Sequence, residues 1–133
     1  MTTNYQKKSF SYTFQTVKRA KRALSCSPFR LKLFQDMRNH SVPIQQIAEQ
    51  SGIQLGYAKE ANSEAKTESK LVWLINVGLL RREVDGQGLT DSFRLTPLGR
   101  QIVDEWEKSE AEIPAASSID RAINWLIQAK MLS

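Results

Sequence analysis

The chain has 133 residues, of which 41% are hydrophobic and 25% are charged, a composition typical of one globular domain and not of a disordered chain. Residues 1–57 carry a net charge of +7 and residues 58–133 carry −2, for a total of +5, and a basic half favours a polyanionic partner. One cysteine excludes an internal disulfide, and no apolar run reaches the ~18 residues of a membrane span, so we expect a cytoplasmic protein without a membrane partner.

Apolar spacing predicts the first helices. After a tail over residues 1–9, a helix is predicted over 12–24, with Lys18, Arg19, Lys21 and Arg22 forming a basic face. Ser27 followed by Pro28 is typical of a helix start and predicts a second helix that ends near Asn39. Val42 is predicted to be a single extended residue.

The middle of the chain leaves one alternative open. Pro43 opens a short predicted helix over 44–50, and Gly52 is the residue expected to end it. For residues 55–77 the sequence allows either one helix from near Tyr57, or a loop followed by a shorter helix capped by Thr67.

A change of periodicity after Gly78 predicts a hairpin. Residues 79–84 and 93–96 read as two strands, joined through turn residues at 85–88. Further helices are predicted over 98–109 and 118–131, separated by a short linker.

This order of elements resembles the winged helix-turn-helix fold of bacterial regulators. Two segments carry the resemblance: Val42–Ile53, with its Ile-Ala pair and turn glycine, and Gly78-Leu79-Leu80 followed by Leu95-Thr96-Pro97-Leu98-Gly99. Regulators similar to the multiple-antibiotic-resistance and phenolic-acid types share the pattern. The implied fold is mainly α with a small β-hairpin wing and extra N- and C-terminal helices. The implied division is a basic tail and helix (1–26), a winged-helix domain (27–112) and a C-terminal dimerisation helix (113–133).

The resemblance implies that the protein binds double-stranded DNA as a transcription regulator. A recognition helix within residues 57–77 would enter the major groove, the hairpin would contact phosphates, and basic residues elsewhere would touch flanking backbone. The implied groove contacts are Asn62, Ser63, Lys66, Ser69 and Lys70. The implied wing contacts are Arg81, Arg82, Gln87 and Arg94, and the implied flanking contacts are Arg30 and the Lys18, Arg19, Lys21 and Arg22 cluster.

Two features depart from the family pattern. The interval from Gly52 to Gly78 is longer than usual by roughly two helical turns, which an insertion or a long helix must absorb. Glu60, Glu64 and Glu68 recur every four residues, and such a carboxylate row facing phosphates would weaken DNA binding. A winged-helix module that binds protein instead of DNA is therefore the alternative function.

The remaining residues favour a non-enzymatic homodimer. Cys26 and His40 lack the context of a nucleophile with its base, no metal-ligand cluster is visible, and no cofactor is expected. The apolar stripe of the last helix is too wide for a lone exposed helix, so this helix either packs on the first helix of its own domain or pairs with a second copy. We predict a homodimer, whose two-fold symmetry would match a palindromic site. A small-molecule effector would have a place between dimer helices beside Phe14, Trp106 and Trp125, although such side chains are more typical of a core.

Overall fold

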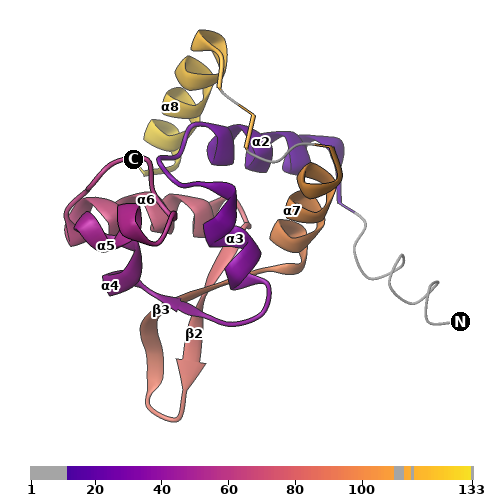
Figure 1. Ribbon diagram of the computed structural model, residues 1–133. Helices are drawn as coiled ribbons and strands as arrows, with labels where there is room; N and C mark the ends of the chain where they lie inside the picture. Colours follow the sequence, from indigo (N-terminus) through magenta and orange to yellow (C-terminus); the bar gives the residue numbers. More distant parts are fainter. Residues whose placement is uncertain (1–11, 110–112, 115, 133) are drawn as a thin grey trace, which may run out of the picture.

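The computed structural model describes residues 12–109, 113–114 and 116–132, so the predicted tail over 1–9 lies outside the described residues. Within these ranges the protein is mainly α, with seven helices and a small three-stranded antiparallel sheet (Figure 1). The helices are α2 (Phe14–Ser25), α3 (Leu31–Met37), α4 (Ile44–Ile47), α5 (Glu49–Gln54), α6 (Glu64–Asn76), α7 (Pro97–Ser109) and α8 (Ser118–Leu132). The strands are β1 (Val42–Pro43), β2 (Leu80–Asp85) and β3 (Gly88–Leu95).

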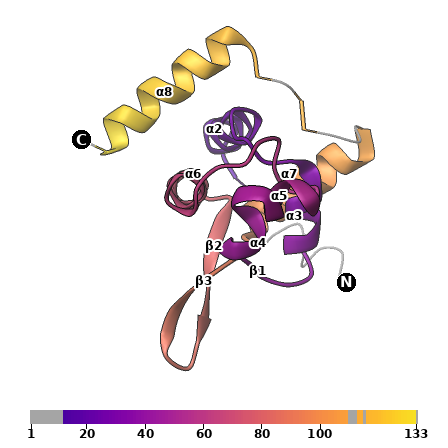
Figure 2. The ribbon, with the colours of Figure 1, turned by 60° about the vertical axis from the view of Figure 1, so that its left-hand side comes forward.

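The sheet has the order β1-β3-β2, so the predicted hairpin forms and the short strand β1 joins its far edge. Val42 lies opposite Phe93, and Leu80 lies opposite Leu95, which directs apolar side chains of all three strands toward the helices. Figures 1 and 2 both show the tip of the hairpin projecting away from the helices. The sheet is therefore anchored at its base and exposed at its tip.

One hydrophobic core joins the sheet to the helices. Phe29 and Phe34 meet edge to face within it, with ring centroids 6.3 Å apart. Its largest fully buried side chains come from both halves of the chain: Phe29, Phe34, Phe93, Leu24, Leu31, Leu33, Met37, Ile47, Leu71, Leu74, Leu79 and Leu80.

The helix α8 lies across α2, at the end of the molecule opposite the hairpin tip (Figure 2). Arg22 of α2 pairs with Asp120 at 3.6 Å, and the Trp73 indole N–H donates to the Asn124 side chain at 3.1 Å. None of the described helices is both long and apolar enough to cross a membrane.

The start of the second predicted helix is wrong. Ser27 and Pro28 precede an extended stretch, and α3 begins only at Leu31, after Arg30. Phe29 forms an isolated bridge with Ala58, and the Lys59 amide donates to the Pro28 carbonyl at 2.9 Å. Pairing with a distant segment thus overrides the local signal for a helix start.

The predicted helix over 44–50 is also wrong, because the chain forms two short helices there. The break falls at Ala48, and Glu49 adopts a left-handed φ of 56° while its amide donates to the Asn62 carbonyl at 2.7 Å. Gly52 lies inside α5, where a Cβ would collide with the Ile47 carbonyl oxygen. Gly52 therefore permits a close approach between α4 and α5, and Gly56, with a φ of 78°, lies just beyond the end of α5.

The open alternative for residues 55–77 resolves to a loop followed by a shorter helix. The loop over 55–63 absorbs the long interval between Gly52 and Gly78. The cap is Ser63, whose side chain accepts from the Lys66 amide at 3.1 Å. The predicted cap Thr67 lies buried inside the helix.

Candidate nucleic-acid interface

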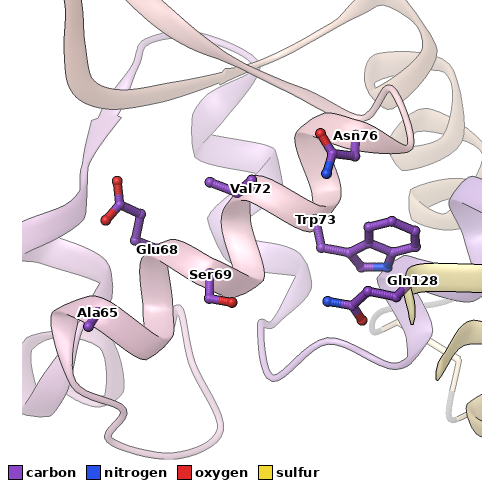
Figure 3. A pocket seen from close by; sticks show the side chains of 7 residues that line it. All are labelled: Ala65, Glu68, Ser69, Val72, Trp73, Asn76 and Gln128. Atoms are coloured by element: carbon purple, nitrogen blue, oxygen red, sulfur yellow. The ribbon is translucent and has the colours of Figure 1, made fainter. Parts of the chain in front are cut away.

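The helix α6 presents one uncovered face between the hairpin and α8. Its residues Ala65, Ser69, Val72 and Asn76, with Glu68 beside them, line a shallow hollow of about 280 Å³ that Trp73 and Gln128 close on the α8 side (Figure 3). Of these residues, the sequence predicts Ser69 as a groove contact and Glu68 as a member of a carboxylate row. The spacing of Ala65, Ser69, Val72 and Asn76 is helical and would have identified the rest.

The opposite face of α6 is buried, which fixes the orientation of the helix. Thr67, Leu71 and Leu74 have almost no exposed surface and pack into the core. The uncovered face therefore carries uncharged side chains apart from Glu68, and it is available to a partner.

The predicted groove contacts separate into different environments. Ser69, Ser63 and Lys66 are exposed and Lys70 is half-buried, whereas Asn62 is only 8% exposed. Asn62 precedes the helix, and its carbonyl accepts hydrogen bonds from the Glu49 amide and from Thr67. The expectation that Asn62 lies on the groove-facing side of the helix is thus wrong, because the loop turns it into the body of the domain.

The hairpin arginines do not share one role. Arg81 is exposed, but the Arg82 side chain is only 19% exposed, pairs with Glu68 at 2.9 Å and lies 4.9 Å over the Phe93 ring. Arg94 pairs with Glu83 at 3.3 Å on the hairpin itself. Among the predicted wing arginines, Arg81 is therefore the one that the structure leaves on the surface without an ion pair to a described residue.

The tip of the hairpin exposes both polar and apolar side chains. Gln87 is exposed there, and its amide donates to the Asp85 carboxylate at 2.7 Å. Val84 and Leu89 are 57% and 73% exposed. The tip can therefore contact a partner through both hydrogen-bonding and apolar groups.

The predicted row of three carboxylates does not form on one helix face. Glu60 lies in the loop before α6, Glu64 lies in its first turn, and Glu68 is engaged by Arg82. The Glu68–Arg82 pair joins α6 to the base of the hairpin, and it partly neutralises the carboxylate nearest the uncovered face.

The basic cluster of α2 lies away from the hairpin, as Figures 1 and 2 both show. Lys21 pairs with Glu105 of α7 at 2.6 Å, and Arg22 pairs with Asp120 of α8. Lys18 is exposed and lies 5.6 Å over the Phe14 ring, while Arg19 is half-buried. The structure thus uses Lys21 and Arg22 to hold helices together and does not bring this cluster beside the hairpin.

Arg30, the other predicted flanking contact, is exposed directly before α3. Its amide donates to the Tyr57 carbonyl at 2.8 Å, which helps to hold the loop after α5.

The last helix has an exposed apolar face. Ile119, Trp125 and Leu126 are 71%, 66% and 58% exposed, and Ala122 and Ala129 of the same helix are exposed as well. Phe14 is exposed as well, whereas Trp106 is buried in the core. The three aromatic residues considered for an effector site therefore occupy different environments.

Cys26 and His40 have different surroundings. Burial raises the pKa of the Cys26 thiol and so disfavours the thiolate, while Arg121, Arg22 and Lys70 partly oppose this shift. His40 is exposed, and its Nδ1 contacts the Ser41 carbonyl at 3.0 Å. Within the described ranges, no group of three or more His, Cys, Asp or Glu side chains is placed to hold a metal ion.

Comparison with known proteins places the chain in a family. No curated protein and no solved structure matches it. A model of the family described as Npun_F0494-like matches residues 10–128, which is nearly the whole chain. That description names no activity and no winged helix-turn-helix class. The chain belongs to the Npun_F0494-like family.

Proposed function

We propose that this protein is a winged-helix DNA-binding protein that regulates transcription as a dimer. The observation that carries the proposal is the uncovered face of α6, which lies beside a projecting hairpin. Each of these two elements also carries an exposed cation, Lys66 on α6 and Arg81 on β2. A helix of about 10–12 Å diameter fits the major groove, and a projecting hairpin reaches the adjacent backbone.

The residues divide by chemistry into base contacts and phosphate contacts. Ser69 and Asn76 offer hydrogen-bonding groups to base edges, and an asparagine amide can form two bonds with adenine. Val72 offers an apolar contact to a thymine methyl group. Arg81 on the hairpin and Lys66 on α6 would neutralise phosphates and position the helix.

The exposed stripe of α8 supports pairing with a second copy. Ile119, Ala122, Leu126 and Ala129 are spaced three, four and three residues apart, the pattern of a helix-pairing seam. In an antiparallel pair centred at Asn124, Ile119 would face the second copy's Ala129, and Ala122 would face its Leu126. Each large side chain would then meet a small one, whereas a parallel pair in register would stack alanine on alanine and leave voids.

A salt-dependent DNA titration tests the DNA proposal. Fluorescence anisotropy with random-sequence duplex DNA at several salt concentrations should show affinity that falls steeply as salt rises. Arg81→Ala should weaken binding roughly threefold to tenfold and reduce the salt slope by about 0.9, because one phosphate contact is lost. Lys108→Ala, which removes an exposed cation from the end of α7, is the matched control and should bind like the wild type. Affinity that is insensitive to salt would refute a phosphate-contacting surface.

Sedimentation analysis tests the dimer separately. Leu126→Glu should shift the protein toward monomer, because it places a charge in the paired seam. Leu89→Glu makes the same substitution at an exposed leucine of the hairpin and should leave the oligomeric state unchanged. A wild type that sediments as a monomer at all concentrations would refute pairing through α8.

One observation favours the alternative of a protein-binding module. Val84 and Leu89 expose apolar surface on the hairpin, and Glu68 lies beside the uncovered face of α6. These groups suit an interface with a protein better than one with phosphates. Duplex binding that is undetectable at low salt, together with a purified protein partner whose affinity falls in Leu89→Glu, would support this alternative.

A further inference from the structure

A second hollow lies between α6, the start of α8 and the turn that follows α2. It has a volume of about 270 Å³ and is formed by the turn over residues 25–28, by Lys59 and Glu60 of the loop before α6, by Lys66 and Lys70 of α6, and by Arg121 of α8. Three separate segments of the chain therefore converge on it, which sequence inspection had not predicted.

The charge of this hollow is strongly positive. Lys59, Lys66, Lys70 and Arg121 face one carboxylate, Glu60, so the lining carries a net charge of +3. The four cations form no ion pair with any side chain in the described part of the chain, in contrast to Lys21, Arg38 and Arg82, which all pair with carboxylates. Holding like charges together without a counterion is unfavourable, so the arrangement favours a bound anion.

The Cys26 thiol, in the wall of this hollow, lies within the electrostatic influence of several of these cations. Burial and Asp120 raise its pKa, but Arg121, Arg22 and Lys70 act to lower it. Cations from α2, α6 and α8 thus act on one point in the wall of the hollow. Lys70 is also half-buried, so its ammonium group is less hydrated than that of a fully exposed lysine and gains more from a fixed anion.

We propose that this hollow binds a small molecule that carries a phosphate or diphosphate group, held between Lys70 of α6 and Arg121 of α8. Arginine bonds phosphate oxygens in a bidentate manner, and lysine supplies a mobile point charge. The volume is at the small end of ligand sites, which suits a diphosphate with part of its organic group. The ligand would join α8 to α6, and the site does not depend on the proposed DNA binding.

Calorimetric titration with pyrophosphate, at constant ionic strength and without DNA, tests this proposal. The wild type should bind one equivalent, and Lys70→Gln and Arg121→Gln should each weaken binding about fivefold to tenfold. Lys108→Gln removes an exposed cation from α7 and should bind like the wild type. Circular dichroism establishes that each variant is folded. Absence of binding at millimolar pyrophosphate, or equal weakening in Lys108→Gln, would overturn the proposal.

Two further measurements separate the sources of phosphate. Cys26 is the sole cysteine of the chain and lines the hollow, so bound pyrophosphate should slow its alkylation, and an unchanged rate would contradict the site. If Lys70→Gln and Arg121→Gln weaken duplex binding and the wild type does not bind pyrophosphate, the hollow holds a DNA backbone phosphate and the small-molecule proposal fails. Failure of the DNA proposal itself would appear in the Arg81→Ala titration and would leave the pyrophosphate result standing.

Discussion

Arg81 and Arg82 are neighbours on β2, yet the structure predicts that replacing each by alanine impairs a different property: stability for Arg82 and DNA affinity for Arg81. Arg82 lies over the buried Phe93 ring, pairs with Glu68 and donates to the Thr90 carbonyl. The cation–ring contact contributes about 1 kcal/mol, the half-exposed ion pair contributes about 0.5 kcal/mol after solvent screening, and the aliphatic stem covers part of the ring. Arg82→Ala should therefore lower the free energy of unfolding by about 2 kcal/mol.

Arg81 is exposed and forms no ion pair with a described residue, so Arg81→Ala should change the free energy of unfolding by less than about 0.5 kcal/mol. Urea denaturation of both variants measures this difference in stability, and titration with duplex DNA at matched salt measures the difference in DNA affinity. We expect the stability loss in Arg82→Ala and the affinity loss in Arg81→Ala. A wild-type urea midpoint for Arg82→Ala, with a lowered one for Arg81→Ala, would show that the assignment of the two arginines is reversed.

Three other outcomes follow from the packing and the titrating groups. In Gly99→Ala the new Cβ would collide with the Leu79 carbonyl oxygen and approach Leu95 Cδ2 to 2.9 Å. Urea denaturation should therefore show that the free energy of unfolding falls by about 2 kcal/mol. The control is Gly86→Ala, whose Cβ would meet nothing within 4 Å and which should be nearly neutral. Tyr57 donates to Asp36 at 2.7 Å, and burial followed by this bond raises the Tyr57 pKa from 10.0 to about 12. The folded pKa of Tyr57 is above the unfolded value, so the stabilisation is complete below pH 10 and is lost as pH rises toward 12. The stability advantage of wild type over Tyr57→Phe should therefore shrink across that interval and should be constant between neutral pH and pH 10. Trp73→Phe removes the hydrogen-bond donor to Asn124 and should accelerate amide hydrogen exchange in α8 without a comparable effect in α6. If the α8 amides exchange at the same rate in the variant and in the wild type, this hydrogen bond does not hold α8 in place.

The sequence predicted elements well where one local signal dominates. The apolar spacing that predicts the helices around α2, α7 and α8, and the turn residues at 85–88 that predict the hairpin, all act within a few residues. Signals that compete with distant pairing were misleading. Ser27 with Pro28 would start a helix in isolation, but the Phe29–Ala58 bridge keeps that stretch extended.

The sequence predicted the exposure of only some residues of the candidate interface. Ser69, Lys66 and Arg81 are exposed as expected, but Asn62 is buried by a loop whose path no local pattern specifies. Arg82 and Arg94 have the residue type of a phosphate contact, yet carboxylates of α6 and of the hairpin engage them. Ion pairs between residues far apart in the chain depend on packing, so charge counts along the sequence could not distinguish these arginines from Arg81.

By itself the sequence determined the basic first half, the single-cysteine chemistry, the helical segments and the hairpin, because composition and periodicity follow from consecutive residues. The tertiary structure alone decided which glycine ends α5, which face of α6 stays uncovered, and which cations remain without carboxylate partners. Those properties depend on side chains that meet across 50 residues or more, such as Trp73 with Asn124 and Lys21 with Glu105. Their meeting is set by the burial of the common core and not by any local preference of the chain.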